Sequence, residues 1–231
     1  MKRINRIVIL TGAGISAESG LGTFRDEGGL WAQHRIEDVA TPEAFERDPA
    51  LVHRFYNARR IQAADASPNA AHDALARLQT TFPGEVMLVT QNVDGLHEKA
   101  GGTAVHMHGE LSRALCAACD HRWDAPSEMS VGETCPSCTA PSARPDIVWF
   151  GEMPYHMERI IDALHSCDLF AAIGTSGQVY PAAGFVEEAR MAGAATVELN
   201  LRDSDMSHAF EDHITGPASK TVPTWVDRLL S

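Results

Sequence analysis

TGAGISAESGLGTFRDEGGLW, residues 11–31, follows the apolar run Ile7–Leu10, which has the composition of a buried parallel strand. Gly12, Gly14 and Ala17 form the pattern G-x-G-x-x-A directly after that run. A strand, a tight turn and a helix start in this order present backbone N–H groups to a pyrophosphate. The pattern also occurs in plain strand-to-helix turns, and no Asp or Glu stands near residue 32 to hold a ribose in the usual way.

Strand and helix patterns alternate along the rest of the chain. Apolar runs predict strands at 86–90, 105–108, 169–173 and 196–199. Helices are expected to begin at the prolines 42, 49 and 68, the second running to about residue 65, and to cover 157–165, 181–192 and 223–230. Such alternation is typical of an α/β fold with a Rossmann-like parallel sheet and helices on both faces.

The composition limits the classes of protein and partner. The 231 residues carry a formal net charge of −12 and 44% hydrophobic residues, which fits one α/β core with small insertions. No transmembrane run is present, and the apolar run after Arg6 is too short for a signal peptide, so we expect a cytoplasmic protein. The acidic charge argues against nucleic acid and anionic membranes as partners and favours a basic peptide.

Four of the five cysteines stand in two close pairs, Cys116-x-x-Cys119 and Cys135-x-x-Cys138. Fifteen residues separate the pairs, the spacing of a four-thiolate tetrahedral zinc site. A closed shell of four sulfurs leaves no open coordination position, so we expect one structural Zn²⁺ that holds this loop-rich insertion together. Acidic residues around the pairs argue against a nucleic-acid-binding ribbon. Cys167 is expected to be a buried small hydrophobe.

Polar residues follow two of the expected strands. Gln91-Asn92-Val93-Asp94 comes after the strand 86–90, and His108 ends the strand 105–108. The carboxyl ends of parallel strands form the ligand-binding edge of such a sheet. An imidazole there can act as a general base, but it can also be a satisfied core histidine, and His106 would share its strand face. The polar run suits ribose hydroxyls and a carboxamide, or a simple polar turn.

Together these motifs resemble the sirtuin family of NAD-consuming protein deacylases. The resemblance is carried by GAGISAESGLGTFR, QNVDGLH, HMHGEL, the two C-x-x-C pairs, VWFGE and GTS, and it covers nearly the whole chain. It implies one catalytic domain over 1–231. Its parts would be a Rossmann-like NAD-binding core at 1–35, 67–112 and 144–231, a helical insertion at 36–66 and a zinc-binding insertion at 113–143.

The resemblance also assigns site residues. The residue before the Gly of the H-G motif, His108, would be the catalytic base. NAD would be bound by Gly12, Ala13, Gly14, Ser16, Glu18, Thr23, Phe24, Arg25, Trp31, Gln91, Asn92, Val93, Asp94, Gly174, Thr175, Ser176, Asn200, Leu201, Arg202 and Ala218. The substrate backbone would lie as an added strand against Val148, Phe150, Gly151, Glu152, Val179 and Tyr180.

The implied chemistry consumes NAD. The acyl oxygen of an acylated lysine attacks the ribose carbon that bears nicotinamide, and His108 then deprotonates a ribose hydroxyl. The products are nicotinamide, O-acyl-ADP-ribose and free lysine. No enzyme nucleophile is required, which agrees with the lack of a recognisable Ser-His-Asp or Cys-His arrangement. A protein ADP-ribosyltransferase, a hydride-transferring dehydrogenase and a non-catalytic reader of acylated peptides are the alternatives.

Tyr56 and Arg59 are candidates for contacting the acyl group. They stand three residues apart, on one face of the helix expected at 49–65. They could simply be a surface arginine lying over a tyrosine ring. The pair also resembles the Y-x-x-R of the bacterial desuccinylase-type (class III) branch of the family, in which both side chains enter the acyl pocket. The resemblance then implies desuccinylase and demalonylase activity beside deacetylase activity, because a guanidinium and a phenol can hold a carboxylate.

Overall fold

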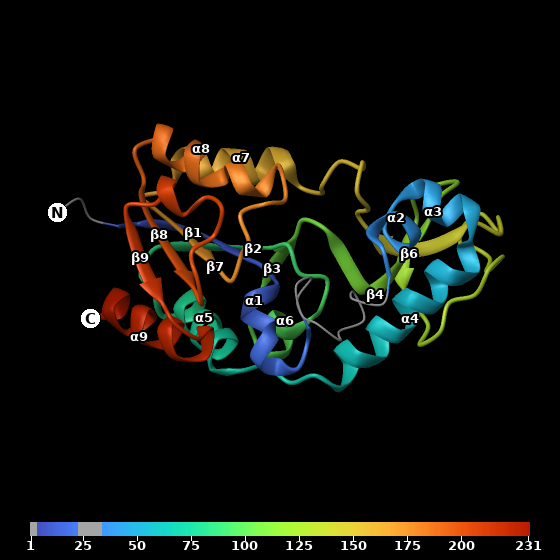
Figure 1. Ribbon diagram of the computed structural model, residues 1–231, viewed down its shortest axis with the longest axis horizontal. Coiled ribbons are helices and arrows are strands. Elements are labelled where there is room, and N and C mark those ends of the chain that lie inside the picture. The colour runs from blue at the N-terminus through green and yellow to red at the C-terminus, as the bar shows by residue number, and fades with distance from the viewer. Residues whose placement is uncertain (1–3, 23–33) are drawn as a thin grey trace.

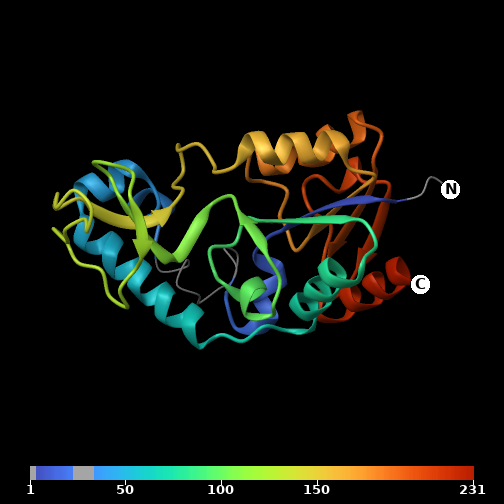
Figure 2. The same ribbon diagram turned by 180° about the vertical axis from the view of Figure 1, so that it is seen from behind.

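The computed structural model describes residues 4–22 and 34–231. At one end of the molecule a parallel sheet lies between two layers of helices, and at the other end a small antiparallel sheet lies beside a second group of helices (Figure 1). The view from behind shows the same division (Figure 2). The predictions for Thr23, Phe24, Arg25 and Trp31 fall outside the described residues.

The larger sheet has six parallel strands. In spatial order they are β3 (Ala104–His106), β2 (Glu85–Thr90), β1 (Arg6–Thr11), β7 (Leu169–Ile173), β8 (Ala195–Asn200) and β9 (Asp212–Thr215). The order of the strands reverses between β1 and β7, and doubly wound sheets bind ligands at the carboxyl edge of such a reversal. The Rossmann-like α/β fold predicted from the sequence is confirmed.

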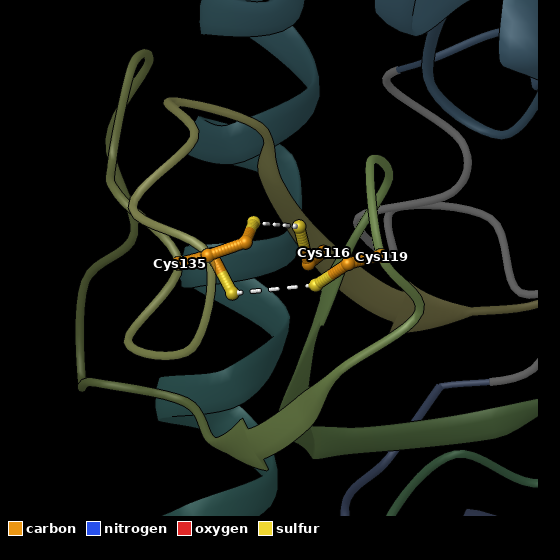
Figure 3. Close-up of side chains that lie close together, drawn as sticks. Cys116, Cys119 and Cys135 are labelled. Carbon is orange, nitrogen blue, oxygen red and sulfur yellow. Dashed lines mark hydrogen bonds between the residues drawn. The ribbon is translucent and has the colours of Figure 1, made fainter.

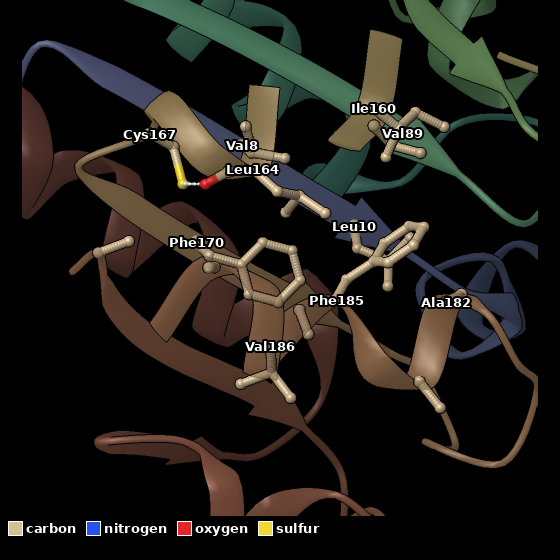
Figure 4. Packing of buried hydrophobic residues seen from close by; sticks show 14 of the residues in the cluster. Val8, Leu10, Val89, Ile160, Leu164, Cys167, Phe170, Ala182, Phe185 and Val186 are labelled. Atoms are coloured by element: carbon tan, nitrogen blue, oxygen red, sulfur yellow. Dashed lines mark hydrogen bonds between the residues drawn. The ribbon is translucent and has the colours of Figure 1, made fainter. Parts of the chain in front are cut away.

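Both faces of this sheet are apolar. Neighbouring residues of each strand point to opposite sides, and the central strands β1 and β7 carry apolar residues at successive positions. Val8 and Leu10 of β1 pack under α7 (Met157–Ser166) and α8 (Phe185–Met191), with Phe170 of β7 between them (Figure 4). Ile7 and Ile9 pack against α5 (Ala70–Thr81) and α9 (Ala218–Leu230). None of the helices in the described ranges is long and apolar enough to span a membrane.

The second part of the molecule is built from two separate segments of the chain. The first holds α2 (Ile36–Val39), α3 (Pro42–Arg47) and α4 (Pro49–Asp65), and the second holds β4 (Gly109–Cys116), β5 (Arg122–Asp124) and β6 (Ala143–Ile147) in the order β5-β4-β6. The side chains of Thr41 and Asp48 accept hydrogen bonds from the first turns of α3 and α4, at 3.1 and 2.9 Å. These are the helix starts predicted from the sequence.

Four expected boundaries are wrong. The helix expected at 181–192 starts with the 3₁₀ turn η3 (Ala182–Gly184), and its α-helical part, α8, begins at Phe185. The helix after Pro68 begins at Ala70, because Asn69 and His72 form a capping box two residues later. The last helix begins at Ala218, and Pro223 lies inside it, where burial of Val222 and Trp225 sustains the helix across the missing N–H. The strand expected at 105–108 ends at His106, and His108 lies in the turn to β4.

Several short elements have no counterpart among the predictions. They are α1 (Ala13–Ser16), η1 (Ala17–Ser19), α6 (Leu96–Lys99), η4 (Ser207–Ala209) and the edge strand β9. Each is too short to show a hydrophobic period of its own. The turn η1 and the helix α1 matter for function, because they carry the residues that follow β1.

Candidate active site and metal centre

The glycines after β1 serve a close contact between two loops. Gly12 N–H donates to Ile173 O at 3.0 Å, and Gly14 N–H donates to Gly174 O at 2.9 Å. A Cβ on Gly12 would lie 2.8 Å from Gly174 O, and one on Gly14 would lie 2.7 Å from Gly174 Cα. These two amides are therefore already used inside the protein, and the prediction that this loop binds NAD stays a prediction.

A buried polar cluster lies below this loop. Ser16 Oγ donates to Asp94 Oδ2 at 3.1 Å, and the Asn92 amide donates to Gly12 O at 3.2 Å and to Ser16 Oγ at 3.1 Å. Ser16, Asn92 and Asp94 are 2%, 8% and 8% exposed. The structure thus brings together predicted cofactor residues from two distant parts of the sequence. Buried amide, hydroxyl and carboxylate groups are a donor set that fits the ribose hydroxyls and carboxamide of NAD.

Two threonines and two histidines that the motif analysis did not place in the site support this cluster from below. Thr11 Oγ1 donates to Thr90 Oγ1 at 2.9 Å and lies 3.0 Å from His97 Nε2, so His97 braces the carboxyl end of β1. The ring of His72 packs on that of His97, with centroids 5.0 Å apart. Burial and the neighbouring His72 lower the pKa of His97 to about 3. A threonine at the end of each of two apolar strands was the available sequence signal.

The two candidate histidines have different surroundings. His106 is buried, and its two ring nitrogens lie 3.2 Å from Asn92 O and 3.3 Å from Glu98 Oε1. Burial alone would lower the pKa of His106, but the hydrogen bond and charge of Glu98 outweigh burial and raise it. His108 Nδ1 lies 3.1 Å from Gln91 O, and among the described residues its Nε2 has no hydrogen-bond partner.

His108 is therefore the imidazole with a nitrogen available for chemistry. His108 Nδ1–H donates a hydrogen bond to the Gln91 carbonyl oxygen. In this tautomer the proton of the neutral ring is on Nδ1, and the lone pair is on Nε2. Burial lowers the pKa of His108, and the hydrogen bond to Gln91 offsets only part of this effect. The ring is consequently neutral, and able to take a proton, at neutral pH.

The backbone around His108 is tied to β6. His108 O accepts from Val148 N–H at 2.9 Å. Gly109 has φ +81°, and a Cβ on it would lie 2.1 Å from Asp146 O. Only glycine fits this left-handed position so close to another strand, which explains the H-G pair.

Gly174, Thr175, Ser176 and Asn200, which are predicted to bind NAD, gather at the ends of β7 and β8. The Asn200 amide donates to Thr175 O at 2.6 Å, and Ser176 O accepts from Asp205 N–H at 3.1 Å. Glu18 accepts from Ser219 N–H at 2.9 Å and from Ser219 Oγ at 2.7 Å, in the first turn of α9 beside Ala218. The Ser219 backbone N–H is the main reason that the pKa of Glu18 is lowered. Leu201 and Arg202 are exposed beyond the end of β8.

The segment predicted to hold the substrate backbone is a rigid turn. Glu152 accepts from Arg144 at 2.7 and 2.9 Å and from Trp149 N–H at 2.8 Å, and Phe150 N–H donates to Ala40 O at 3.0 Å. The Glu152 carboxylate thus closes the turn. Phe150 is exposed, like Tyr180 on the second predicted substrate segment, whose side chain is 68% exposed. Gly151 and Val179 belong to the same two segments.

Tyr56 and Arg59 lie on α4 as the spacing predicted. The Tyr56 ring is 1% exposed, and its hydroxyl accepts from Trp149 Nε1 at 3.0 Å. Burial raises the pKa of Tyr56 to about 12, so the phenol keeps its proton. The Arg59 guanidinium lies 6.0 Å from the centre of that ring. Burial lowers the pKa of Arg59, and the charges of Tyr56 and Asp94 offset part of this shift.

The four paired cysteines come together at the end of β4 (Figure 3). Cys116 and Cys138 Sγ are 3.6 Å apart, Cys119 and Cys135 Sγ are 3.8 Å apart, and all four sulfurs lie within 4.8 Å of one another. Zinc–sulfur bonds of about 2.3 Å at tetrahedral corners separate the sulfurs by about 3.8 Å. The cluster therefore fits a structural zinc ion.

Backbone and hydroxyl donors surround two of these sulfurs. Ala118 N–H donates to Cys116 Sγ at 3.4 Å, and Ser137 N–H donates to Cys135 Sγ at 3.3 Å. The Ser142 hydroxyl, 3.1 Å from Cys116 Sγ, is the largest cause that lowers the pKa of that thiol to about 6. Such donors stabilise the thiolate form that binds metal. Cys167 is buried in the core beside Leu164, as predicted (Figure 4).

The model of the Sir2 family matches residues 12–181. The chain belongs to the Sir2 family. Over its whole length it is 54% identical to a protein of Bdellovibrio bacteriovorus and 52% identical to one of Caulobacter vibrioides, each covered to 99% and each named NAD-dependent protein deacylase. The crystal structure of a Sir2 homologue in complex with NAD superposes with a TM-score of 0.91 at 34% identity, covering 99% of this chain and 92% of that one. This Sir2-family chain is therefore similar over its whole length to proteins of that name.

Proposed function

We infer that this chain is an NAD-dependent protein deacylase that acts on acylated lysine in peptides and proteins. Its similarity to whole proteins of that name supports the activity. The single observation that carries the mechanism is the state of His108, whose Nδ1 is held by Gln91 O and whose Nε2 is available. NAD, when bound, supplies an electrophilic ribose carbon with nicotinamide as the leaving group.

The residues of this chain perform three tasks in the reaction. The cluster of Ser16, Asn92 and Asp94 binds the nicotinamide ribose and the carboxamide, and its burial keeps water away. His108 Nε2 takes a proton from a ribose hydroxyl, and Gln91 O holds the imidazole in the required tautomer. The four-cysteine site holds the insertion and takes no part in the chemistry, because its shell is closed.

The proposal is tested by mass spectrometry of acetyl-lysine peptides incubated with and without NAD. We expect peptide deacetylation only with NAD, and an activity loss of about a hundredfold or more in His108→Ala, because a positioned base contributes that much. His106→Asn is the matched control, since His106 leaves neither ring nitrogen free among the described residues. If His108→Ala were active and His106→Asn inactive, the catalytic base would be His106, and the assignment to His108 would be wrong.

Labelled NAD tests the alternative function in the same assay. A protein ADP-ribosyltransferase shares the first bond cleavage, so label would remain on the acceptor protein. A deacylase leaves the label on a small molecule, O-acyl-ADP-ribose.

We also place the enzyme in the cytoplasm, since four zinc-binding thiolates require a reducing compartment. For the domain limits, we propose those given by the resemblance.

The acyl specificity extends to succinyl and malonyl groups in this proposal. Arg59 is a partly buried cation on the same helix face as Tyr56, whose hydroxyl keeps a proton to donate while it accepts from Trp149. Trp149 lies inside the segment 148–152, so the pair sits next to the predicted substrate strand. A partly buried guanidinium and a phenol bind a terminal carboxylate, whereas an acetyl methyl needs neither.

Arg59→Met is expected to lower kcat/KM for succinyl-lysine peptides by one to two decades, because a charge-assisted bond contributes about 1.5–3 kcal/mol. The acetyl reaction should change little. Arg54→Met, an exposed arginine on the same helix, is the control and should leave both reactions unchanged. Equal losses on both peptides in Arg59→Met would mean that Arg59 supports the fold or NAD binding.

A further inference from the structure

A closed hydrogen-bond network joins β5, β6 and the segment after β6. Its centre is the Asp146 carboxylate, whose side chain is 6% exposed. Arg122 Nε donates to Asp146 Oδ2 at 3.0 Å, and the Tyr155 hydroxyl donates to Asp146 Oδ1 at 2.8 Å. The Arg122 guanidinium also lies 4.9 Å from the centre of the Tyr155 ring. These three residues are called the Asp146 network.

The same residues hold the turn that carries His108. Tyr155 N–H donates to Met107 O at 2.9 Å, and Val148 N–H, two residues after Asp146, donates to His108 O at 2.9 Å. Asp146 O lies against Gly109, where a Cβ would be 2.1 Å from it. Each residue of the turn 107–109 therefore contacts the backbone of β6 or of the segment after it, and the Asp146 carboxylate fixes these two stretches relative to each other.

Arg122 brings the four-cysteine insertion into this network. It is the first residue of β5 and follows the predicted zinc ligand Cys119 by three positions. Between them, His121 O accepts from Cys116 N–H at 2.9 Å. The position of Arg122 is thus set by the loop that the four sulfurs close.

We propose, on the basis of the proposed function, that Asp146 together with Arg122 and Tyr155 positions the His108 imidazole, so that order in the four-cysteine insertion is passed to the catalytic base. The network contacts the turn 107–109. The buried cluster of Ser16, Asn92 and Asp94 has its own hydrogen bonds to Gly12. Loosening the network therefore slows the step that needs the base and leaves the cleavage of the nicotinamide bond nearly unchanged.

The two steps are measured separately on the zinc-loaded full chain. Exchange of labelled nicotinamide into NAD in the presence of an acetyl-lysine peptide reports the first step, and release of deacetylated peptide reports the step that uses His108. Tyr155→Phe removes one hydroxyl and keeps the ring and the backbone contact. We expect it to lower deacetylation about tenfold, with exchange within about twofold, because small misplacements of a catalytic group have effects of this order. Asp146→Asn should act in the same direction.

Arg113→Met is the matched control. It breaks the ion pair of Arg113 and Asp124, 2.7 Å long, between β4 and β5 of the same small sheet without reaching Asp146. Zinc content and melting temperature are recorded for every variant, and Tyr155→Phe decides if Asp146→Asn does not fold. Equal loss of both rates in Tyr155→Phe, or rates equal to those of Arg113→Met, would overturn the inference. A wild-type protein without either reaction would overturn the proposed function and this inference with it.

Discussion

The two sheets of this protein are held together by different forces. The six-stranded sheet is covered on both faces by large apolar side chains, among them Phe170, Phe185 and Leu78, each under 2% exposed. The cysteine-bearing part of the small sheet has a cluster of three buried apolar residues, Ala114, Met129 and Ala143. A core of that size contributes little, so the insertion depends on its thiolates and on ion pairs. The other end of the small sheet, with Leu111 of β4 and Ile147 of β6, packs in an apolar cluster with α4, so the dependence on metal is confined to the cysteine-bearing end.

Loss of one thiolate should have the largest effect and should separate the two parts. Cys135→Ser is expected to abolish zinc binding and unfold the insertion, since structural zinc contributes on the order of 10 kcal/mol to small zinc domains. Metal analysis and hydrogen exchange check this result. Amides of β4 and β5 should lose protection, whereas those of β1, β2 and β7 should keep it.

Cys167→Ser is the control for that change. Cys167 is buried among the apolar residues under α7 and α8 and lies outside the metal cluster. This variant should keep its zinc and lower the stability of the larger sheet alone. Full protection of β4 and β5 in zinc-free Cys135→Ser would show that the insertion folds on apolar contacts, and the comparison would fail.

Acid should act on the larger part in a way that the insertion does not share. The pKa of His97 is lowered to about 3 in the folded protein, whereas in the unfolded chain it is near 6.5. Between these pH values the unfolded chain binds a proton at His97 and the folded protein does not. The stabilisation is complete above pH 6.5 and is lost as pH falls from there towards 3. Its slope is about 1.4 kcal/mol per pH unit for one proton.

Urea unfolding at several pH values between 7 and 5 measures this slope. His97→Asn should flatten it, because the asparagine side chain binds no proton in this pH range. Equal slopes in wild type and His97→Asn would mean that His97 is charged in the folded protein.

The smallest effect is expected where the loop after β1 meets α9. Glu18→Gln removes the charge that accepts from Ser219 at the start of the helix, and a carboxylate there contributes about 0.5 kcal/mol. Because the pKa of Glu18 is lowered in the folded state, its stabilisation is present above about pH 4.5 and is lost at lower pH. Thermal unfolding should show a difference at pH 7 that vanishes near pH 3. A difference that persists at pH 3 would point to packing and not to charge.

Local chemistry made part of this structure predictable. Thr41 and Asp48 cap α3 and α4 with side chains a few residues away, and the cysteine pairs carry their spacing in the sequence. The choice between His106 and His108 was not local. It depends on Glu98 and on the Gln91 carbonyl, which reach the two rings only in the folded sheet.

The same limit applies to other contacts between distant parts of the chain. Whether Gly12 offers its N–H to a phosphate depends on Ile173, about 160 residues away, which takes that hydrogen bond in the fold. The start of α9 likewise depends on burial of Val222 and Trp225 against the larger sheet, which outweighs the helix-breaking tendency of Pro223. Neither contact leaves a mark in the neighbouring sequence.

The meeting of Gly12, Gly14 and Gly174 has a consequence for how this sequence can evolve. A methyl group on any of the three would strike backbone atoms of the loop that it faces, at 2.5–2.8 Å, and no change of side chain can move a backbone atom aside. A substitution at any one of the three positions therefore cannot be compensated by a substitution at another of them. In a library of random variants, each should be closed to every residue except glycine, while Gly101, with nothing within 4 Å of an added Cβ, should accept asparagine.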